Sequence, residues 1–166
     1  MQSGGERHSY LTRSLLWLAK ASIIAISVVM IAVTLAQVVF RYLLTAPLPW
    51  SEELARYCFV WIVFLGGAIG LSRGIHLGVD LFVNVLPLRL QHGVNLLVSA
   101  LIAGFAVAVI YASQPVIQMN MMQRSPALGF QMSWIYIAIP ISMGLIALIS
   151  VERIISGLRA GPGGER

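Results

Sequence analysis

The chain has 166 residues, of which 58% are hydrophobic and only 10% are charged, with a mean hydropathy of +0.87. A water-soluble domain devotes about a quarter of its residues to Asp, Glu, Lys and Arg, so the composition excludes that class and predicts a single membrane domain, residues 1–166. The net charge of +5 is spread along the chain without interleaved aromatic residues, which argues against nucleic acid as a partner.

Four segments in chain order are long and apolar enough to cross a bilayer, at about 21–42, 52–72, 92–112 and 132–152. None alternates as barrel strands do, and backbone polar groups in lipid must be satisfied within their own segment. We therefore predict an all-α membrane protein with four transmembrane helices. The shorter segment 77–86 mixes Leu, Val and Phe with Asp80 and Asn84, which predicts a short interfacial helix between the second and third spans.

Basic residues beside the four segments predict their orientation. Lys and Arg are in excess on the side that holds both termini, and such an excess is typical of the cytoplasmic side. The residues on that side are Arg7, Arg13, Lys20, Arg73, Arg89, Arg153, Arg159 and Arg166, and those on the other are Arg41, Arg56 and Arg124. The N- and C-termini are therefore predicted to be cytoplasmic.

Local signals predict where the helices begin, bend and end. Ser51 is expected to cap the second helix, with Glu52 and Glu53 in the first turn, where the helix dipole favours negative charge. Pro115 is expected to end the third helix and Pro140 to kink the fourth.

The second segment opens with a cluster of charges. Arg56 lies one helical turn from both Glu52 and Glu53, so a local ion pair is available. The alternative is a charged contact with a second membrane protein, because Arg56 lies close to the hydrocarbon boundary. Both interpretations stay open at this stage.

A basic turn interrupted by glycine follows the second segment and carries Arg73, His76, Gly78 and Asp80. A metal site needs more ligands than one His and one Asp, so docking at the cytoplasmic face is favoured over a proton relay or a metal site.

Polar and small residues inside the segments predict contacts between helices. Gln37 lies at membrane depth and is expected to form a hydrogen bond to another helix. Small residues recur at four-residue spacing, which permits close helix approach, and packing among the chain's own helices is favoured over a partner interface. These residues are Gly66 and Gly70 in the second segment and Ala100, Gly104 and Ala108 in the third.

The segments lack the residues of an autonomous transporter or an enzyme. No carboxylate lies at the centre of a span, no histidine pair suits a haem, and no glycine-rich phosphate loop is present. We expect no enzymatic activity and no catalytic, cofactor-binding or metal-binding residue in this chain.

Three motifs follow one another between residues 50 and 87: W-S-E-E-L-A-R-Y, V-W-I-V-F-L-G-G-A and R-G-I-H-L-G-V-D. This segment resembles the small membrane subunit (DctQ family) of tripartite ATP-independent periplasmic (TRAP) transporters. The resemblance implies a secondary transporter of the bacterial inner membrane, in which a periplasmic substrate-binding protein delivers an organic acid. It also implies a large subunit that holds the substrate and sodium sites and moves as an elevator. The small subunit would enlarge the fixed scaffold of that subunit, among membrane lipids.

The resemblance implies a structural or partner-interface role for the motif positions. Gly70 is added to them because it lies four residues after Gly66. The positions are Trp50, Glu52, Glu53, Arg56, Trp61, Gly66, Gly70, Arg73, His76, Gly78 and Asp80. Two other classes stay open. A membrane-anchor subunit of a redox or signalling complex would bring a cofactor or a soluble partner, and a self-assembling exporter would need a carboxylate deeper in the membrane.

Overall fold

A computed structural model describes residues 9–73 and 87–160 of the chain. The predicted interfacial segment 77–86, together with His76, Gly78 and Asp80, lies outside these residues. The described part folds into helices, and four stretches are long and apolar enough to cross a membrane, which confirms an all-α, multi-pass membrane protein. The helices are α1 (Tyr10–Tyr42), α2 (Pro49–Ser72), α4 (Leu88–Met119), α5 (Ser133–Tyr136) and α6 (Ala138–Ala160).

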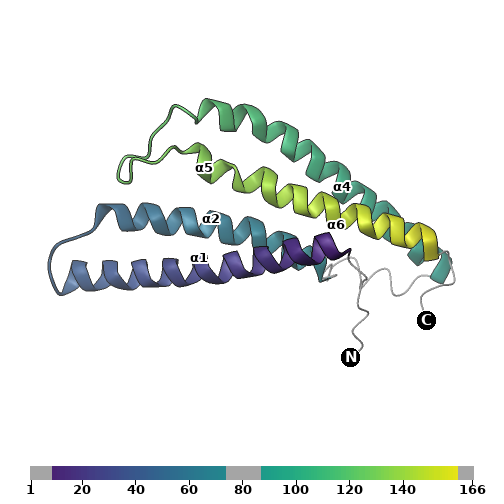
Figure 1. The fold of residues 1–166 in the computed structure, drawn as a ribbon, viewed down its shortest axis with the longest axis horizontal. Coiled ribbons are helices and arrows are strands. Elements are labelled where there is room, and N and C mark those ends of the chain that lie inside the picture. The colour runs from purple at the N-terminus through teal and green to yellow at the C-terminus, as the bar shows by residue number, and fades with distance from the viewer. Residues whose placement is uncertain (1–8, 74–86, 161–166) are drawn as a thin grey trace.

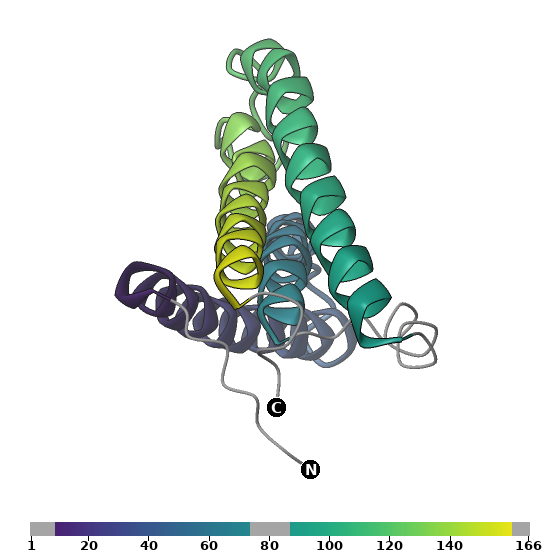
Figure 2. The same cartoon turned by 90° about the vertical axis from the view of Figure 1, so that its right-hand side faces the viewer.

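The long helices pack in the order α1, α2, α6, α4 and do not close into a bundle. Helix α6 packs against both α4 and α2, whereas α1 packs mainly against α2. Seen from one end, α1 lies to one side and α4 leans away from it (Figure 2). Helices α1 and α4 therefore leave much of their apolar surface uncovered by the rest of the chain. Such a surface suits contact with lipid or with a protein partner.

The core lies where α1, α2 and α6 meet. It contains small and branched side chains from all three helices, namely Leu16, Ala19, Leu65, Ala68, Leu71, Leu145 and Ile149. Trp61 is partly buried and packs against this cluster. The start of α1 and the end of α6 lie at one end of the molecule, and the α1–α2 and α4–α5 connections lie at the other (Figure 1).

The second helix begins without the predicted cap. The residue that caps α2 is Leu48, and Pro49 occupies the first helical position, where its missing N–H costs nothing. The Ser51 hydroxyl is buried and donates to the carbonyl of Leu48 (2.7 Å). The prediction that Ser51 caps the helix is therefore wrong.

The two prolines in the later helices act differently. Pro115 lies inside α4, so the prediction that it ends the helix is wrong. The helix continues to Met119, and Asn120 caps its end with hydrogen bonds to the Val116 carbonyl from its backbone N–H (3.2 Å) and its side-chain amide (2.8 Å). Pro140 cannot donate to the carbonyl of Tyr136, and the fourth span is interrupted there between α5 and α6. The break lies at Ile137, three residues before Pro140, and the kink expected at Pro140 stays a prediction.

Candidate functional site

Polar contacts join α6 to α1 at the end where α1 begins. Glu152 Oε1 accepts hydrogen bonds from the buried Thr12 hydroxyl (2.6 Å) and from the backbone N–H of Ser9 (3.3 Å). Ser9 is the N-cap of α1, and its hydroxyl accepts the N–H of Thr12. A carboxylate at this position is stabilised by the positive end of the α1 dipole.

The next residue along α6 joins a third helix. Arg153 Nη2 donates to the backbone carbonyl of Leu71 (2.8 Å), in the last turn of α2. Carbonyls in the last turn of a helix are available to donors from outside it, and a cation is favoured at a helix C-terminus. We call the residues Ser9, Thr12, Leu71, Glu152 and Arg153 the terminal clasp, because they connect α1, α2 and α6.

Sequence reasoning missed the terminal clasp. Charge counting places Arg153 only among the basic flanking residues, and the sequence pattern gives Glu152 no role. A usable signal existed, since Glu152 is one of six acidic residues in the chain and stands beside a basic residue at the end of a membrane-length segment.

At the opposite end, Glu52 joins α2 to α1. Its Oε1 accepts a hydrogen bond from Gln37 Nε2 (2.9 Å) and lies 4.0 Å from Arg41 Nη1. This confirms the interhelical hydrogen bond predicted for Gln37. The Arg41 and Glu52 side chains are largely exposed, so their ion pair contributes little.

The neighbouring carboxylate holds the connection between α4 and α5. Residues 123–132 form a hairpin in which Arg124 and Gln131 are bridged, and the N–H of Ser125 donates to Phe130 O (2.8 Å). Glu53 Oε2 accepts the backbone N–H of Ala127 at the hairpin tip (2.9 Å), and Glu53 Oε1 accepts the Tyr57 hydroxyl. We call these contacts of Glu53 the hairpin anchor.

The predicted local ion pair does not form. Among the described residues, no carboxylate lies within 4.0 Å of the Arg56 guanidinium, and the Arg56 side chain is exposed. The reason is competition, because Glu52 meets donors from α1 and Glu53 meets the Tyr57 hydroxyl and a backbone N–H. The interpretation of Arg56 as a partner contact stays a prediction.

The other described motif positions lie along α2. Trp50 is exposed in its first turn, and Trp61 packs on the core. Arg73 is the C-cap, with an exposed side chain and a backbone N–H that donates to the carbonyls of Ile69 and Gly70. These positions are spread along the length of the helix, so they do not form one site within the chain.

The glycines of the small-residue pattern do not mediate packing within the chain. A Cβ placed on Gly66, Gly70 or Gly104 would meet no atom within 4 Å, so the favoured interpretation of these glycines is wrong. The close approach lies at Gly157 of α6, where a Cβ would stand 2.9 Å from Leu96 Cδ2 of α4.

Charged groups in the described residues therefore hold helix ends together. No cluster of three or more His, Cys, Asp or Glu residues suits a metal ion in residues 9–73 and 87–160. The lone cysteine, Cys58, is buried in α2.

The comparisons with known proteins agree on one family. Residues 30–160 match the profile described as tripartite ATP-independent periplasmic transporters, DctQ component. The chain is 30% identical to the sialic acid TRAP transporter small permease protein SiaQ of Vibrio cholerae over 127 residues, 75% of this chain and 72% of that protein.

Two further relatives share shorter segments. The chain is 32% identical over 84 residues to the C4-dicarboxylate TRAP transporter small permease protein DctQ of Vibrio cholerae, covering 51% of this chain and 36% of that protein. It is 32% identical over 101 residues to the isethionate TRAP transporter permease protein DctMQ of Oleidesulfovibrio alaskensis, covering 60% of this chain and 16% of that protein. The match therefore spans well under two thirds of the length of these two relatives.

Proposed function

The chain belongs to the DctQ component of the tripartite ATP-independent periplasmic (TRAP) transporters, and we propose that it is the fixed scaffold beside the large permease subunit. One observation carries the proposal. The described polar contacts between helices lie in two layers, the terminal clasp at one end and the contacts of Glu52 and Glu53 at the other. Between the layers the described helices carry no carboxylate, and their two cations, Lys20 and Arg56, lie nearer to the layers than to the midplane.

A body of this kind suits a scaffold. Polar contacts between helices resist their relative motion, most strongly at the terminal clasp, whereas a carrier needs an element that moves. The uncovered faces of α1 and α4 leave wide apolar surface for lipid and for a larger membrane protein. As a transporter membrane subunit, the chain falls outside the enzyme classes. It needs no cofactor of its own, and sodium coupling belongs to the large subunit.

The relatives support a partnership with a larger permease. The segment similar to this chain is 72% of the small permease SiaQ but only 16% of the permease DctMQ, so one relative carries it within a much longer polypeptide. The relatives' names specify sialic acid, a C4-dicarboxylate and isethionate, which are organic acids. We propose organic acid uptake, with the substrate delivered by a periplasmic binding protein.

The proposed location is the bacterial inner membrane, with both termini in the cytoplasm. The basic residues around the termini support that orientation. The hairpin and the α1–α2 connection then face the periplasm. Arg56 would face the large subunit, because its side chain is exposed in the described chain. Gly66 and Gly70 would lie at the same interface, because a Cβ added to either would meet no atom within 4 Å.

The test is co-purification followed by transport. The tagged chain should bring down the large permease of the same organism in equal amount from mild detergent. Proteoliposomes should take up one of the three named acids under a sodium gradient only when this chain, the large subunit and the binding protein are all present. Recovery of a homo-oligomer alone, or full uptake without this chain, would overturn the proposal.

A paired variant tests the partner-facing assignment. Arg56→Gln should reduce recovery of the large subunit, because it removes an exposed charge near the hydrocarbon boundary that has no partner carboxylate in the described chain. Arg159→Gln changes an exposed cation in the last turn of α6 and should not affect recovery. Equal recovery with both variants would remove Arg56 from the interface.

A further inference from the structure

A cavity of about 300 Å³ lies between α2, the hairpin and α5. Its walls are almost wholly apolar, and its residues are Tyr57, Trp61, Phe130, Gln131, Trp134 and Ile135. The side chains of Phe130 and Trp134 are 61% and 64% exposed, so the cavity opens to the surroundings of the chain. Its volume lies at the lower end of the range for small-molecule sites.

The depth of the cavity identifies what surrounds it. Tyr57 and Trp61 lie eight and twelve residues beyond Pro49, the first residue of α2, or about 12 and 18 Å along the helix axis. Helix α2 is a candidate span, and the hydrocarbon core is about 30 Å thick. The opening of the cavity therefore faces acyl chains.

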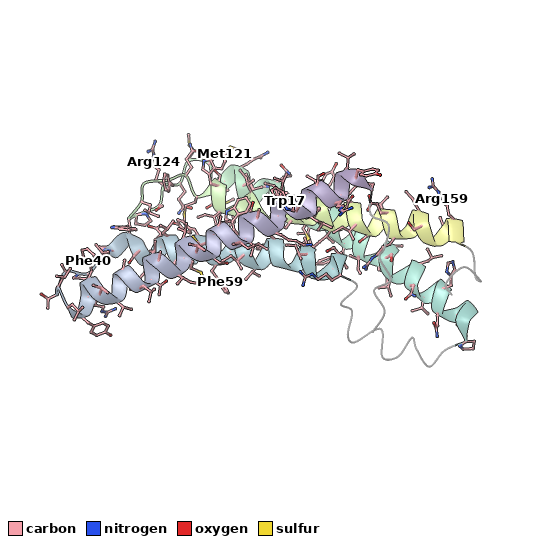
Figure 3. The ribbon with its side chains drawn as sticks, turned by 60° about the horizontal axis from the view of Figure 1, so that its bottom comes forward. Trp17, Phe40, Phe59, Met121, Arg124 and Arg159 are labelled. Carbon is pink, nitrogen blue, oxygen red and sulfur yellow. The ribbon has the colours of Figure 1, made fainter. Side chains whose placement is uncertain are left out.

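The hairpin that supplies Phe130 and Gln131 to the cavity also carries a cation, Arg124. Arg124 is bridged to Gln131, which lines the cavity, and its side chain points away from the helices (Figure 3). No carboxylate of the described residues forms an ion pair with it. The hairpin tip is bonded to Glu53, one helical turn before Tyr57, so Arg124 belongs to the layer nearer the water. A guanidinium there offers paired N–H donors that match a phosphate.

We propose that the cavity and Arg124 form a binding site for one anionic phospholipid. An acyl chain lies among Trp61, Phe130 and Trp134, and the phosphate group pairs with Arg124. The positive charge of Arg124 favours a lipid over an apolar protein segment as the occupant of the cavity. An apolar segment would fill the cavity and leave the guanidinium without a counter-charge, whereas one phospholipid supplies both the chain and the anion.

The experiment uses the full chain in mixed micelles that contain equal amounts of dioleoylphosphatidylglycerol and dioleoylphosphatidylcholine, with bound lipid counted by native mass spectrometry. The wild type should retain one phosphatidylglycerol in preference to phosphatidylcholine. Arg124→Gln should lower that retention about tenfold, because it removes a charge-assisted bond, and Arg124→Lys should lower it less. Trp134→Ala should weaken retention of both lipids.

Two matched controls lie outside the site. Arg159→Gln removes an exposed cation at the other end of the molecule (Figure 3), and Trp17→Ala removes a tryptophan that is 66% exposed, close to the exposure of Trp134. Both should retain lipid as the wild type does. The four altered side chains are exposed, so all variants should keep the wild-type helical circular dichroism.

Three results would overturn the proposal. The first is no preference for phosphatidylglycerol in the wild type. The second is equal retention by the wild type and by Arg124→Gln or Trp134→Ala. The third is loss of the bound lipid when the large permease subunit joins the complex, because that result would assign the cavity to the protein partner.

Discussion

The two ends of the molecule use carboxylates in different ways. At the terminal clasp, Glu152 accepts from a fully buried hydroxyl and from the backbone at the N-cap of α1, while its neighbour Arg153 bonds to the end of α2. At the opposite end, Glu52 forms an exposed pair, and Glu53 holds the hairpin. The first end joins three helices, whereas the second joins one helix pair and positions one connection.

From this difference we infer that burial, and not the number of charges, decides how strongly each end holds the helices together. A hydrogen bond between a carboxylate and a buried hydroxyl leaves an unsatisfied group when it is broken, which is costly. An exposed pair can exchange its partner for water or lipid headgroups at little cost. The following predictions test this comparison, from the largest expected effect to the smallest.

Glu152→Ala should be the most destabilising of these changes. It leaves the buried Thr12 hydroxyl and the Ser9 N–H without this acceptor, and the expected loss in free energy of unfolding is about 2 kcal/mol. Denaturant titration in mild detergent, followed by circular dichroism, measures it. In a double-mutant cycle, Thr12→Val should cost much less in the Glu152→Ala background than in the wild type. Additive effects of the two changes would refute the coupling.

Glu53→Ala should release the hairpin with little effect on the helices. The Ala127 N–H loses its acceptor, so its hydrogen exchange should accelerate about tenfold, while amides in the core of α2 stay protected. Hydrogen-exchange mass spectrometry of residues 123–132 measures this. Glu52→Ala is the matched control, because it changes the adjacent carboxylate without touching the hairpin. Equal acceleration in both variants would contradict the hairpin anchor.

Ser142→Ala should leave stability unchanged or raise it by up to about 1 kcal/mol. Ser142 lies between the two ends, and its buried hydroxyl has no hydrogen-bond partner among the residues that the structure describes, so removing it relieves a desolvation cost. Ser150→Ala is the control, because that buried hydroxyl donates to the Ile146 carbonyl (2.9 Å). Thermal unfolding of both variants measures the difference. A clear loss of stability in Ser142→Ala would show that the hydroxyl has a partner after all.

Glu52→Gln should have the smallest effect. The amide oxygen can still accept from Gln37, and only the exposed attraction to Arg41 is lost. The free energy of unfolding should stay within about 0.5 kcal/mol of the wild type, with a weaker dependence on salt. Unfolding at two ionic strengths measures both quantities. A loss in free energy of unfolding as large as that of Glu152→Ala would mean that the exposure of the side chains does not explain the difference between the two ends.

Much of the architecture could be predicted because it depends on composition and segment length. Four apolar segments of membrane length require helices, and the motifs from Trp50 onward were sufficient to indicate the family. The partners of individual side chains could not be predicted. Arg56 is a turn away from Glu52 and Glu53, yet both carboxylates bond to groups from other parts of the chain that sequence spacing does not reveal.

By itself the sequence determined that the chain folds in a membrane, that its spans are helices and which family it belongs to. Each of these follows from the residue types and their order along the chain. The tertiary structure alone decided the open packing order, the terminal clasp and the cavity beneath the hairpin. The physical reason is distance along the chain. Glu152 and Thr12 are 140 residues apart along the chain, and Arg153 and Leu71 are 82 residues apart. Only the packing of α6 against α2 and the start of α1 brings them within hydrogen-bond reach.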